Sequence, residues 1–338
     1  MPKKIVYIGN MTQAWKGVPT TIETLSKQLQ REGIQIITAS HYRNKAKRLL
    51  HMLLVVLRNS RSTKYVLIDT YSTQNFWYAV TIGNVCRLLH IPYIPILHGG
   101  NLPQRLQKNP SQSKKLFHGA KTNVAPSHYL LEAFQKEGYS NVTFISNTIE
   151  IDQYPFKQRN EVLPKLLWVR SFAKIYHPML ALKVLERLQG LFPVASLCMV
   201  GPDKDGSLAQ CQAYATQKNL NVTFTGKLSK KEWIDRSQDY DIFINTTNFD
   251  NTPVSVMEAM ALGLPVISTN VGGIPYLLKH KTDALCVPPN DVEVFVEAII
   301  TLYQTPEMAR NIARHARKKV MAFDWSVVKD HWLHLLQD

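Results

Sequence analysis

The sequence predicts an α/β fold made of two doubly wound domains, each built on a parallel sheet covered by helices. Short apolar runs rich in β-branched residues alternate with amphipathic stretches of helix length along the chain. Parallel strands need long crossover connections, so this alternation favours parallel sheets. The 338 residues, 45% of them hydrophobic, suit two domains of ~100 to 200 residues each.

Two series of apolar runs mark the strands. The first series lies at residues 4–9, 34–39, 65–69, 93–97, 122–125 and 142–145, and the second at 166–170, 195–200, 222–225, 242–245, 265–268 and 284–287. Residues 146–163, between the two series, are polar and contain prolines. We therefore predict one domain at 1–150 and a second at 151–321. Ligands of doubly wound sheets bind beyond the carboxyl ends of the strands, so candidate site residues are sought in the loops that follow them.

Two loops of the first half carry candidate binding residues. Gly17 precedes a predicted helix whose first turn holds a possible capping box from Thr20 to Glu23, and the backbone N–H groups of a helix start can hold an anion. A bare strand-to-helix turn would have the same composition. His98 stands where a strand ends, before Gly99 and Gly100. Glycines let the backbone approach a ligand, although a lone histidine can equally be structural.

Two cations and two carboxylates stand out in the second half. Arg170 ends a strand and Lys174 follows four residues later, before the next predicted helix. Such a pair beside a helix N-terminus suits a diphosphate, and the alternative is two solvated loop cations. Asp250 precedes a predicted helix that contains Glu258. Carboxylates accept hydrogen bonds from vicinal hydroxyls, so these two suit a sugar and a ribose.

A second glycine turn, Gly272-Gly273, follows the strand at 265–268 and again suits a phosphate. Together with residues 250–268, this turn resembles the Glu-x7-Glu region of retaining glycosyltransferases of the GT-B fold, family 4 type, also called glycosyl transferases group 1. Further motifs of that family follow in the same order over the whole chain: Gly17, His98-Gly-Gly, Pro126-Ser127, Ser146-Asn147, Arg170 with Lys174, Gly201-Pro202, Gly226-Lys227 and Phe323-Asp-Trp325.

The resemblance implies a role for each of these positions. By this resemblance, Glu258 binds the ribose, Asp250 contacts the donor sugar, and Arg170 and Lys174 neutralise the diphosphate. His98 lies at the reaction centre, and the turn at Gly17 approaches the phosphates and the acceptor. Gly272 and Gly273 close on the donor, and the base lies near Gly226 and Lys227.

The resemblance also implies an architecture and an activity. Two Rossmann-like domains would face each other across a cleft, with a C-terminal helix at about 322–338 packing back on the first. The expected enzyme is a hexosyltransferase that uses a UDP- or GDP-linked sugar, retains the anomeric configuration and needs no cofactor and no metal. Asp250 stands in place of the family's usual glutamate, the spacing from Arg170 to Lys174 is shorter than usual, and Tyr276 stands where an acid often follows.

Two Asp-x-Asp triplets, at Asp203 and at Asp239, match the metal-binding pattern of the other large glycosyltransferase fold. The first lies in a predicted loop, and the second acid of the other opens a predicted strand. Neither has the context of that fold, so we expect no catalytic metal.

The positive charge is concentrated in the first half. The net charge is +15, and residues 1–160 hold 21 of the 40 Lys and Arg but 7 of the 25 Asp and Glu. Seven of these cations and no acid lie between Arg43 and Lys64, around an apolar run at 49–57. This pattern suits a helix on an anionic bilayer, and the alternative is an ordinary helix with a buried face and solvated ends. We expect a peripheral enzyme at the cytoplasmic membrane with a lipid-linked or saccharide acceptor, in cell-surface polysaccharide or glycolipid synthesis.

Other features of the sequence bear on where the protein acts and on which other functions it could have. Four widely separated cysteines suit reduced thiols, no secretion signal opens the sequence, and the apolar run at 49–57 is about half of the ~20 residues that a spanning helix needs. A sugar-nucleotide 2-epimerase of the same fold is the alternative enzyme. A basic nucleic-acid-binding protein would explain the charge but not the carboxylates and glycine turns, so we expect no nucleic acid partner.

Overall fold

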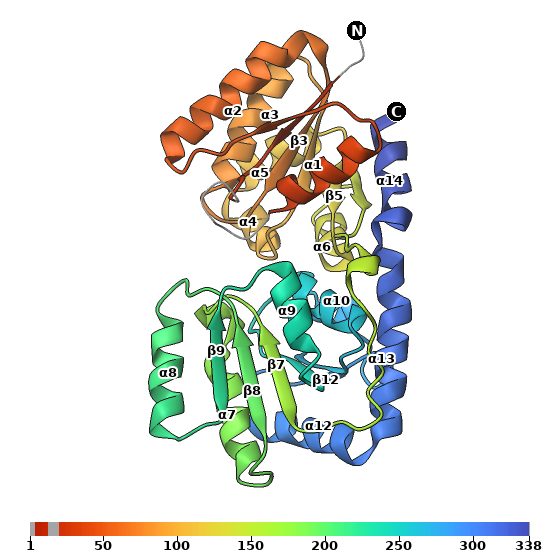
Figure 1. Ribbon diagram of the computed structural model, residues 1–338. Helices are drawn as coiled ribbons and strands as arrows, with labels where there is room; N and C mark the ends of the chain where they lie inside the picture. The colour runs from red at the N-terminus through yellow and green to blue at the C-terminus, as the bar shows by residue number, and fades with distance from the viewer. Residues whose placement is uncertain (1–3, 13–19, 338) are drawn as a thin grey trace. The chain divides into compact units, whose positions relative to one another are not determined.

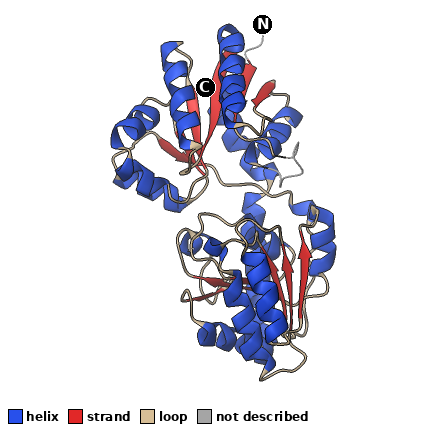
Figure 2. Cartoon of the chain, turned by 90° about the vertical axis from the view of Figure 1, so that its left-hand side faces the viewer, coloured by secondary structure: helices blue, strands red, loops and turns tan. Residues whose placement is uncertain are grey.

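The computed structural model describes residues 4–12 and 20–337, and it divides into two compact units (Figure 1). Unit 1 comprises Met1–Ser146 with Val328–Asp338, and unit 2 comprises Asn147–Val327. Each unit contains a six-stranded sheet whose strands pair in parallel, with helices on its two faces (Figure 2). The predicted α/β fold with two doubly wound sheets is therefore confirmed.

The sheet of unit 1 has the strand order β2-β1-β3-β4-β5-β6. Its strands are β1 (Lys4–Ile8), β2 (Ile36–Ala39), β3 (Thr63–Thr70), β4 (Tyr93–Leu97), β5 (Asn123–Ala125) and β6 (Val142–Phe144). Its helices are α1 (Thr21–Arg31), α2 (Lys45–Asn59), α3 (Phe76–Leu88), α4 (Leu102–Lys108), α5 (Pro110–His118) and α6 (His128–Lys136), with the short η2 (Ser60–Ser62). The chain runs outward from β1 to β2 and then returns to β3 on the other side of β1, which makes the β1/β3 edge the topological switch point.

Helix α1 begins as the sequence predicts. The Thr20 and Glu23 side chains form the capping box, and the Glu23 carboxylate accepts a hydrogen bond of 2.9 Å from the Thr20 amide. Ile22, Leu25 and Leu29 are buried at helical spacing, while Thr24 and Lys27 are exposed. The helix is therefore fixed at its start by its cap and along its length by its apolar face.

The sheet of unit 2 has the order β12-β11-β10-β7-β8-β9, so its switch point lies between β7 and β10. Its strands are β7 (Lys165–Val169), β8 (Ser196–Val200), β9 (Val222–Gly226), β10 (Ile242–Asn245), β11 (Val266–Thr269) and β12 (Leu285–Val287). Its helices are η3 (Ile151–Gln153), η4 (Lys174–Tyr176), α7 (Pro178–Gln189), α8 (Ser207–Gln217), α9 (Lys230–Ser237), α10 (Val254–Ala261), α11 (Ile274–Leu277), α12 (Val292–Gln304), α13 (Pro306–Val320) and η5 (Met321–Phe323).

The last helix, α14 (Trp325–Gln337), starts in unit 2 and continues into unit 1. Within unit 1 it buries Val328, Trp332 and Leu336, four residues apart. The Lys64 ammonium binds the carbonyls of Leu336 and Gln337 at the end of the helix. A cation at this end balances the helix dipole.

The two chain segments that lead into and out of unit 2 are hydrogen-bonded to each other. The Ile149 amide donates to Phe323 O at 3.0 Å, and the Trp325 amide donates to Ile149 O at 3.1 Å. The Asp324 carboxylate accepts from the Ile151 amide at 2.8 Å. These bonds join the beginning and the end of unit 2.

The sheets are buried because their strands are apolar on both faces. In unit 2, β7 turns Trp168 toward a cluster with α7 and α12, and turns Leu167 toward a cluster with α10. Unit 1 has a large cluster in which Val66 and Ile68 of β3 pack against α2 and α3. Among the described residues, no helix is long and apolar enough to cross a bilayer.

Candidate functional site

The switch point of unit 2 brings Arg170 and Asp250 together. Arg170 directly follows β7, and its guanidinium forms an ion pair with the Asp250 carboxylate. Both side chains are 15% exposed, and the guanidinium lies over the Tyr176 ring, 4.4 Å from its centroid. A largely buried cation is therefore held between a carboxylate and an aromatic face, two groups that favour its charged form.

The Asp250 loop packs tightly on the Gly272-Gly273 turn. The Gly273 amide donates to Asp250 O at 2.8 Å, and Gly272 has a φ of +56°. A Cβ atom on Gly272 would collide with Asp250 O, and one on Gly273 would collide with Asn251 O. The two glycines are thus required by the approach of two backbone segments, whether or not a phosphate also binds there.

Threonines after β10 fasten the loop that carries Lys174. The Thr246 hydroxyl lies 3.0 Å from Tyr176 O and also accepts from the Trp168 indole at 3.0 Å. The Thr247 hydroxyl lies 3.3 Å from Ile175 O. The backbone of the Arg170 to His177 loop is fixed in this way, whereas the Lys174 side chain is exposed and interacts electrostatically with Asp205.

Glu258 lies on α10, and its side chain is 6% exposed. Its Oε1 accepts a hydrogen bond of 2.8 Å from the Tyr154 hydroxyl and also binds the Lys230 ammonium. Burial raises the pKa of Tyr154 well above its usual range, so this hydroxyl stays protonated and donates. Tyr154 and Lys230 were not singled out from the sequence.

Gly226 ends β9, and Lys227 follows it in the loop before α9. Gly226 has a φ of +69°, which favours glycine. Ser229 then caps α9 in a capping box with Glu232, and Lys230 is the first residue of the helix. Through Lys230, this loop is in contact with Glu258. The two predicted carboxylates therefore lie in different settings, Asp250 with Arg170 and Glu258 with Lys230.

The two Asp-x-Asp triplets support local structure. Asp205 accepts from the Lys174 amide at 2.8 Å and from the Ser207 amide at 3.2 Å, so it ties the start of α8 to the Lys174 loop. Asp241 accepts from the Leu163 amide at 3.2 Å and lies 3.7 Å from Arg159. Within residues 4–12 and 20–337, no three His, Cys, Asp or Glu side chains gather as a metal site would require.

In unit 1, His98 follows β4 and contacts a buried carboxylate. Its Nε2 lies 2.8 Å from Asp69 Oδ1, and the same oxygen accepts from the Tyr7 hydroxyl at 2.8 Å. The Asp69 side chain is fully buried and that of His98 is 7% exposed. Asp69 was not singled out from the sequence, although it ends the strand at 65–69.

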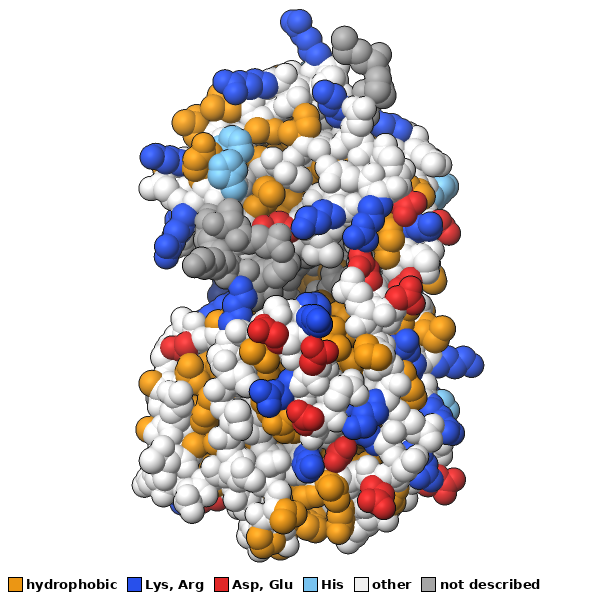
Figure 3. Space-filling view, in the orientation of Figure 1, with side chains coloured by type: hydrophobic (Ala, Val, Ile, Leu, Met, Phe, Trp, Pro, Cys, Tyr) orange, Lys and Arg blue, Asp and Glu red, His pale blue; other side chains and the backbone are white. Residues whose placement is uncertain are grey.

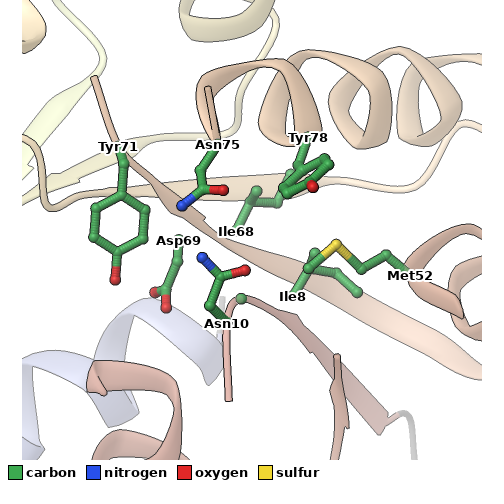
Figure 4. Close-up of a pocket in the computed structure, with 9 residues that line it drawn as sticks. Ile8, Asn10, Met52, Ile68, Asp69, Tyr71, Asn75 and Tyr78 are labelled. Carbon is green, nitrogen blue, oxygen red and sulfur yellow. The ribbon is translucent and has the colours of Figure 1, made fainter. Parts of the chain in front are cut away.

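A small pocket adjoins Asp69 at the β1/β3 switch point (Figure 4). Figure 4 shows the polar ends of Asn10, Asp69 and Asn75 on one side of it, and the apolar Met52 and Ile68 on the other. About 10 Å³ of it accepts the centre of a water molecule, which is about the room that one water needs. Gly17, the remaining predicted residue of unit 1, lies outside the described residues.

Two of the seven cations between Arg43 and Lys64 are bound by other groups of unit 1. Arg48 is 8% exposed, and its guanidinium donates to Tyr42 O at 2.8 Å and to Asn10 Oδ1 at 3.0 Å. Lys64 binds the end of α14. A sequence pattern of charges does not distinguish these two from cations that face solvent.

The family model described as Glycosyl transferases group 1 matches residues 150–319, half of the chain. The chain belongs to this family. A relative is the glycogen synthase of Mycobacterium tuberculosis (strain H37Rv), 25% identical over 196 residues, which are 56% of this chain and 47% of that protein. Another is the sulfoquinovosyl transferase SQD2 of Arabidopsis thaliana, 26% identical over 43% of this chain and 28% of the relative. The chain thus spans about half the length of these relatives or less.

Solved structures share the fold of this group 1 chain over nearly its full length. Sucrose-phosphate synthase from Thermosynechococcus elongatus has a TM-score of 0.81 at 16% identity, and 99% of this chain and 98% of that one are covered. Anabaena HepE in complex with UDP-glucose has a TM-score of 0.76 at 15% identity, with 99% of each chain covered. These likenesses confirm the GT-B fold, with two Rossmann-like units.

Proposed function

We propose that this group 1 family member is a hexosyltransferase that moves a sugar from a UDP- or GDP-linked donor to a lipid-linked or saccharide acceptor with retention of configuration. The observation that carries the proposal is the group at the β7/β10 switch point, where Arg170, Asp250 and the Gly272-Gly273 turn lie together. The relative HepE was solved with UDP-glucose bound, which supports a nucleotide sugar as the donor.

Different residues of unit 2 are proposed to bind different parts of the donor. The Arg170 guanidinium and the exposed Lys174 ammonium are the proposed partners of the diphosphate, Glu258 binds the ribose, and the base rests near Gly226 and Lys227. Asp250 faces the sugar in this assignment. His98 keeps the role at the reaction centre that the resemblance implies, and Asp69 fixes its ring.

The proposed chemistry is front-face displacement. The bond between the anomeric carbon and the diphosphate oxygen breaks as the acceptor oxygen bonds to the same face of that carbon, and the acceptor proton passes to the leaving phosphate. Charge accumulates on the diphosphate, so a preorganised cation such as Arg170 lowers the barrier. No step uses a metal, because guanidinium and backbone N–H groups supply the positive potential.

The proposed site of action is an anionic membrane surface on the cytoplasmic side, where cell-surface polysaccharide or glycolipid is assembled. Leu50, Leu54 and Leu57 of α2 are 57%, 37% and 48% exposed and share one face of the helix. The exposed cations of this segment, apart from Lys45, are Arg43, Lys47, Arg58 and Arg61. We name this surface of leucines and four cations the α2 face. Lys and Arg side chains surround hydrophobic ones where α2 lies (Figure 3).

A panel of sugar nucleotides tests the proposed activity. A ligand at 100 times its dissociation constant stabilises the folded state by about 2.7 kcal/mol. We expect one of UDP-glucose, UDP-galactose, UDP-N-acetylglucosamine and GDP-mannose to raise the melting temperature and to be slowly hydrolysed. A protein that none of these stabilises would not have this function. Epimerised sugar nucleotide as the product would replace the transferase by an epimerase.

A further inference from the structure

We propose that Lys230 and Glu258 together form a clamp for the vicinal hydroxyls of the donor ribose, with Lys230 donating to one hydroxyl and Glu258 accepting from its neighbour. The proposal rests on the proposed function, since it takes a nucleoside diphosphate as the ligand of unit 2. It adds Lys230 as a specificity-determining residue and Tyr154 as a positioning residue.

Glu258 keeps one carboxylate oxygen for a ligand. Both of its recorded hydrogen bonds use Oε1, from the Tyr154 hydroxyl and from the Lys230 ammonium. A carboxylate oxygen has two lone-pair directions, so Oε1 is saturated. No described residue is recorded as a donor to Oε2. One acceptor oxygen of a nearly buried carboxylate is therefore left for a ligand hydroxyl.

Lys230 keeps N–H donors for a ligand. An ammonium has three donors and no acceptor, and Glu258 Oε1 takes one of them. The Lys230 side chain is 48% exposed, so its other donors are accessible from solution. A free acceptor oxygen and free N–H donors next to each other match two adjacent hydroxyls, one that donates and one that accepts.

Lys230 and Glu258 are also held in place by their surroundings. Lys230 is the first residue of α9, whose start is fixed by the Ser229 and Glu232 capping box, and α9 lies beside α10 (Figure 1). Tyr154 is 3% exposed, and its carbonyl accepts from Arg317 at 2.8 Å. The Lys230 ammonium also lies 5.6 Å from the centroid of the Tyr154 ring. Both partners of Glu258 are thus held before any ligand arrives, which reduces the entropy lost on binding.

The sequence also offers a matched control. Lys231 is the next residue, on the same helix and with the same charge, but it is exposed and has no recorded partner among the described residues. Replacing Lys230 or Lys231 by Met removes one positive charge from nearly the same place. Only the first replacement removes the proposed donor to the ribose.

Calorimetric titration of the full chain with UDP and GDP, and with their 2′-deoxy and 3′-deoxy forms, tests the clamp. A hydrogen bond from a charged group is worth about a factor of ten or more in affinity. We expect the wild type to bind each of the two deoxy forms about tenfold more weakly than the parent nucleotide, because each lacks one of the two bound hydroxyls. Lys230→Met should bind the parent nucleotide about tenfold more weakly than the wild type does, and it should no longer distinguish the deoxy form that lacks the hydroxyl bound by Lys230. Lys231→Met should behave like the wild type.

Three results would overturn the clamp while leaving the proposed function intact. The first is that Lys230→Met binds the parent nucleotide as tightly as the wild type does, or more tightly. The second is that Lys230→Met loses the same affinity for the parent nucleotide and for both deoxy forms. The third is that Lys231→Met loses as much affinity as Lys230→Met does. Tighter binding would show that Lys230 obstructs Glu258. If neither UDP nor GDP binds the wild type, the proposed function is wrong and the clamp with it.

Discussion

Arg170, the residue proposed to bind the diphosphate, and Asp250, the residue proposed to face the sugar, are in contact before any donor is present. Asp250 is one methylene shorter than the glutamate usual in the family, and its carboxylate is engaged by Arg170. The Asn251 amide also donates to Asp250 Oδ1 at 2.8 Å. A diphosphate that reaches Arg170 therefore meets a guanidinium whose direction is already set by a carboxylate.

Arg170→Ala tests the electrostatic part of the proposal. Removing one preorganised partner of a developing charge lowers turnover by ~100-fold or more, so we expect at least that loss, measured as kcat with saturating donor. Arg187→Ala is the control, because Arg187 is a half-exposed cation of α7 that pairs with Glu293 at the surface. Activity that EDTA abolishes and a divalent ion restores would refute the metal-free mechanism.

Glu258→Ala tests the ribose contact. We expect donor binding to weaken by about 2 to 4 kcal/mol, because hydrogen bonds to a charged group are lost. The Tyr154 hydroxyl and the Lys230 ammonium lose their shared acceptor as well, so a melting curve must accompany the titration. Glu297→Ala, an exposed glutamate of α12, is the control. A Michaelis constant for the donor that does not change would remove Glu258 from the site.

Residue types were predictable from the sequence, but their partners were not. Arg170 stood out because it ends a predicted strand, and Asp250 and Glu258 stood out because two carboxylates lie before and within one predicted helix. Tyr154 is 104 positions from Glu258, and Asp69 is 29 positions from His98. No sequence period connects residues so far apart, because their contact depends on which strands become neighbours in the sheet.

At the scale of elements, the strands were the most predictable feature. All twelve lie within two residues of their predicted bounds, since short β-branched runs between helical stretches have few other interpretations. Charged helices were less predictable. The cations around α2 have the same appearance in sequence, yet Arg48 is buried and bonded, whereas Arg58 faces solvent.

Asp324→Asn tests the junction between the segments at 149–151 and 323–325. Burial opposes the charge of Asp324, but hydrogen bonds from Ser326 and from the Ile151 amide outweigh it and lower the pKa of this carboxyl. A lowered pKa means that the carboxylate stabilises the folded state above the unfolded pKa and that this stabilisation is lost as the pH falls. We expect the substitution to cost about 1 to 2 kcal/mol at neutral pH.

The measurement is urea unfolding at pH 7 and at a pH below the usual range of an aspartate. The difference between the wild type and Asp324→Asn should shrink at the acid pH, because the wild-type carboxyl is then also neutral. Asp330→Asn, on α14 beyond the junction, is the control. An equal difference at both pH values would mean that the charge of Asp324 does not stabilise the junction.

At the scale of the whole molecule, the charge is unevenly distributed between the two halves of the sequence. The excess of cations lies in residues 1–160, while the proposed donor residues lie in the balanced second half. Mutations on α2 and mutations in the donor site therefore fall in different units. Membrane binding and donor binding can be changed separately, and the two are expected to respond to different variants.

The α2 face predicts binding to anionic vesicles. Each basic residue near an anionic surface contributes ~1 kcal/mol, so the loss of four should reduce partitioning by about three decades. The variant replaces Arg43, Lys47, Arg58 and Arg61 by glutamine, and it spares Arg48 and Lys64, which bind other groups of unit 1. A matched control replaces four other exposed cations of unit 1, at Lys108, Lys114, Lys115 and Lys136.

We expect the first variant to stop sedimenting with anionic vesicles and to lose activity on a lipid acceptor, and the control variant to retain both. Donor binding should survive in both, because Arg170 and Glu258 belong to unit 2. A third variant, Leu50→Gln with Leu57→Gln, removes apolar side chains that are about half exposed and should weaken binding at high salt, where screening has reduced the electrostatic part. If both quadruple variants bind anionic vesicles more weakly than the wild type does, and by the same amount, the net charge of the protein drives binding and the position of the cations near α2 does not matter. If neither binds less at physiological salt, the basic half serves another partner.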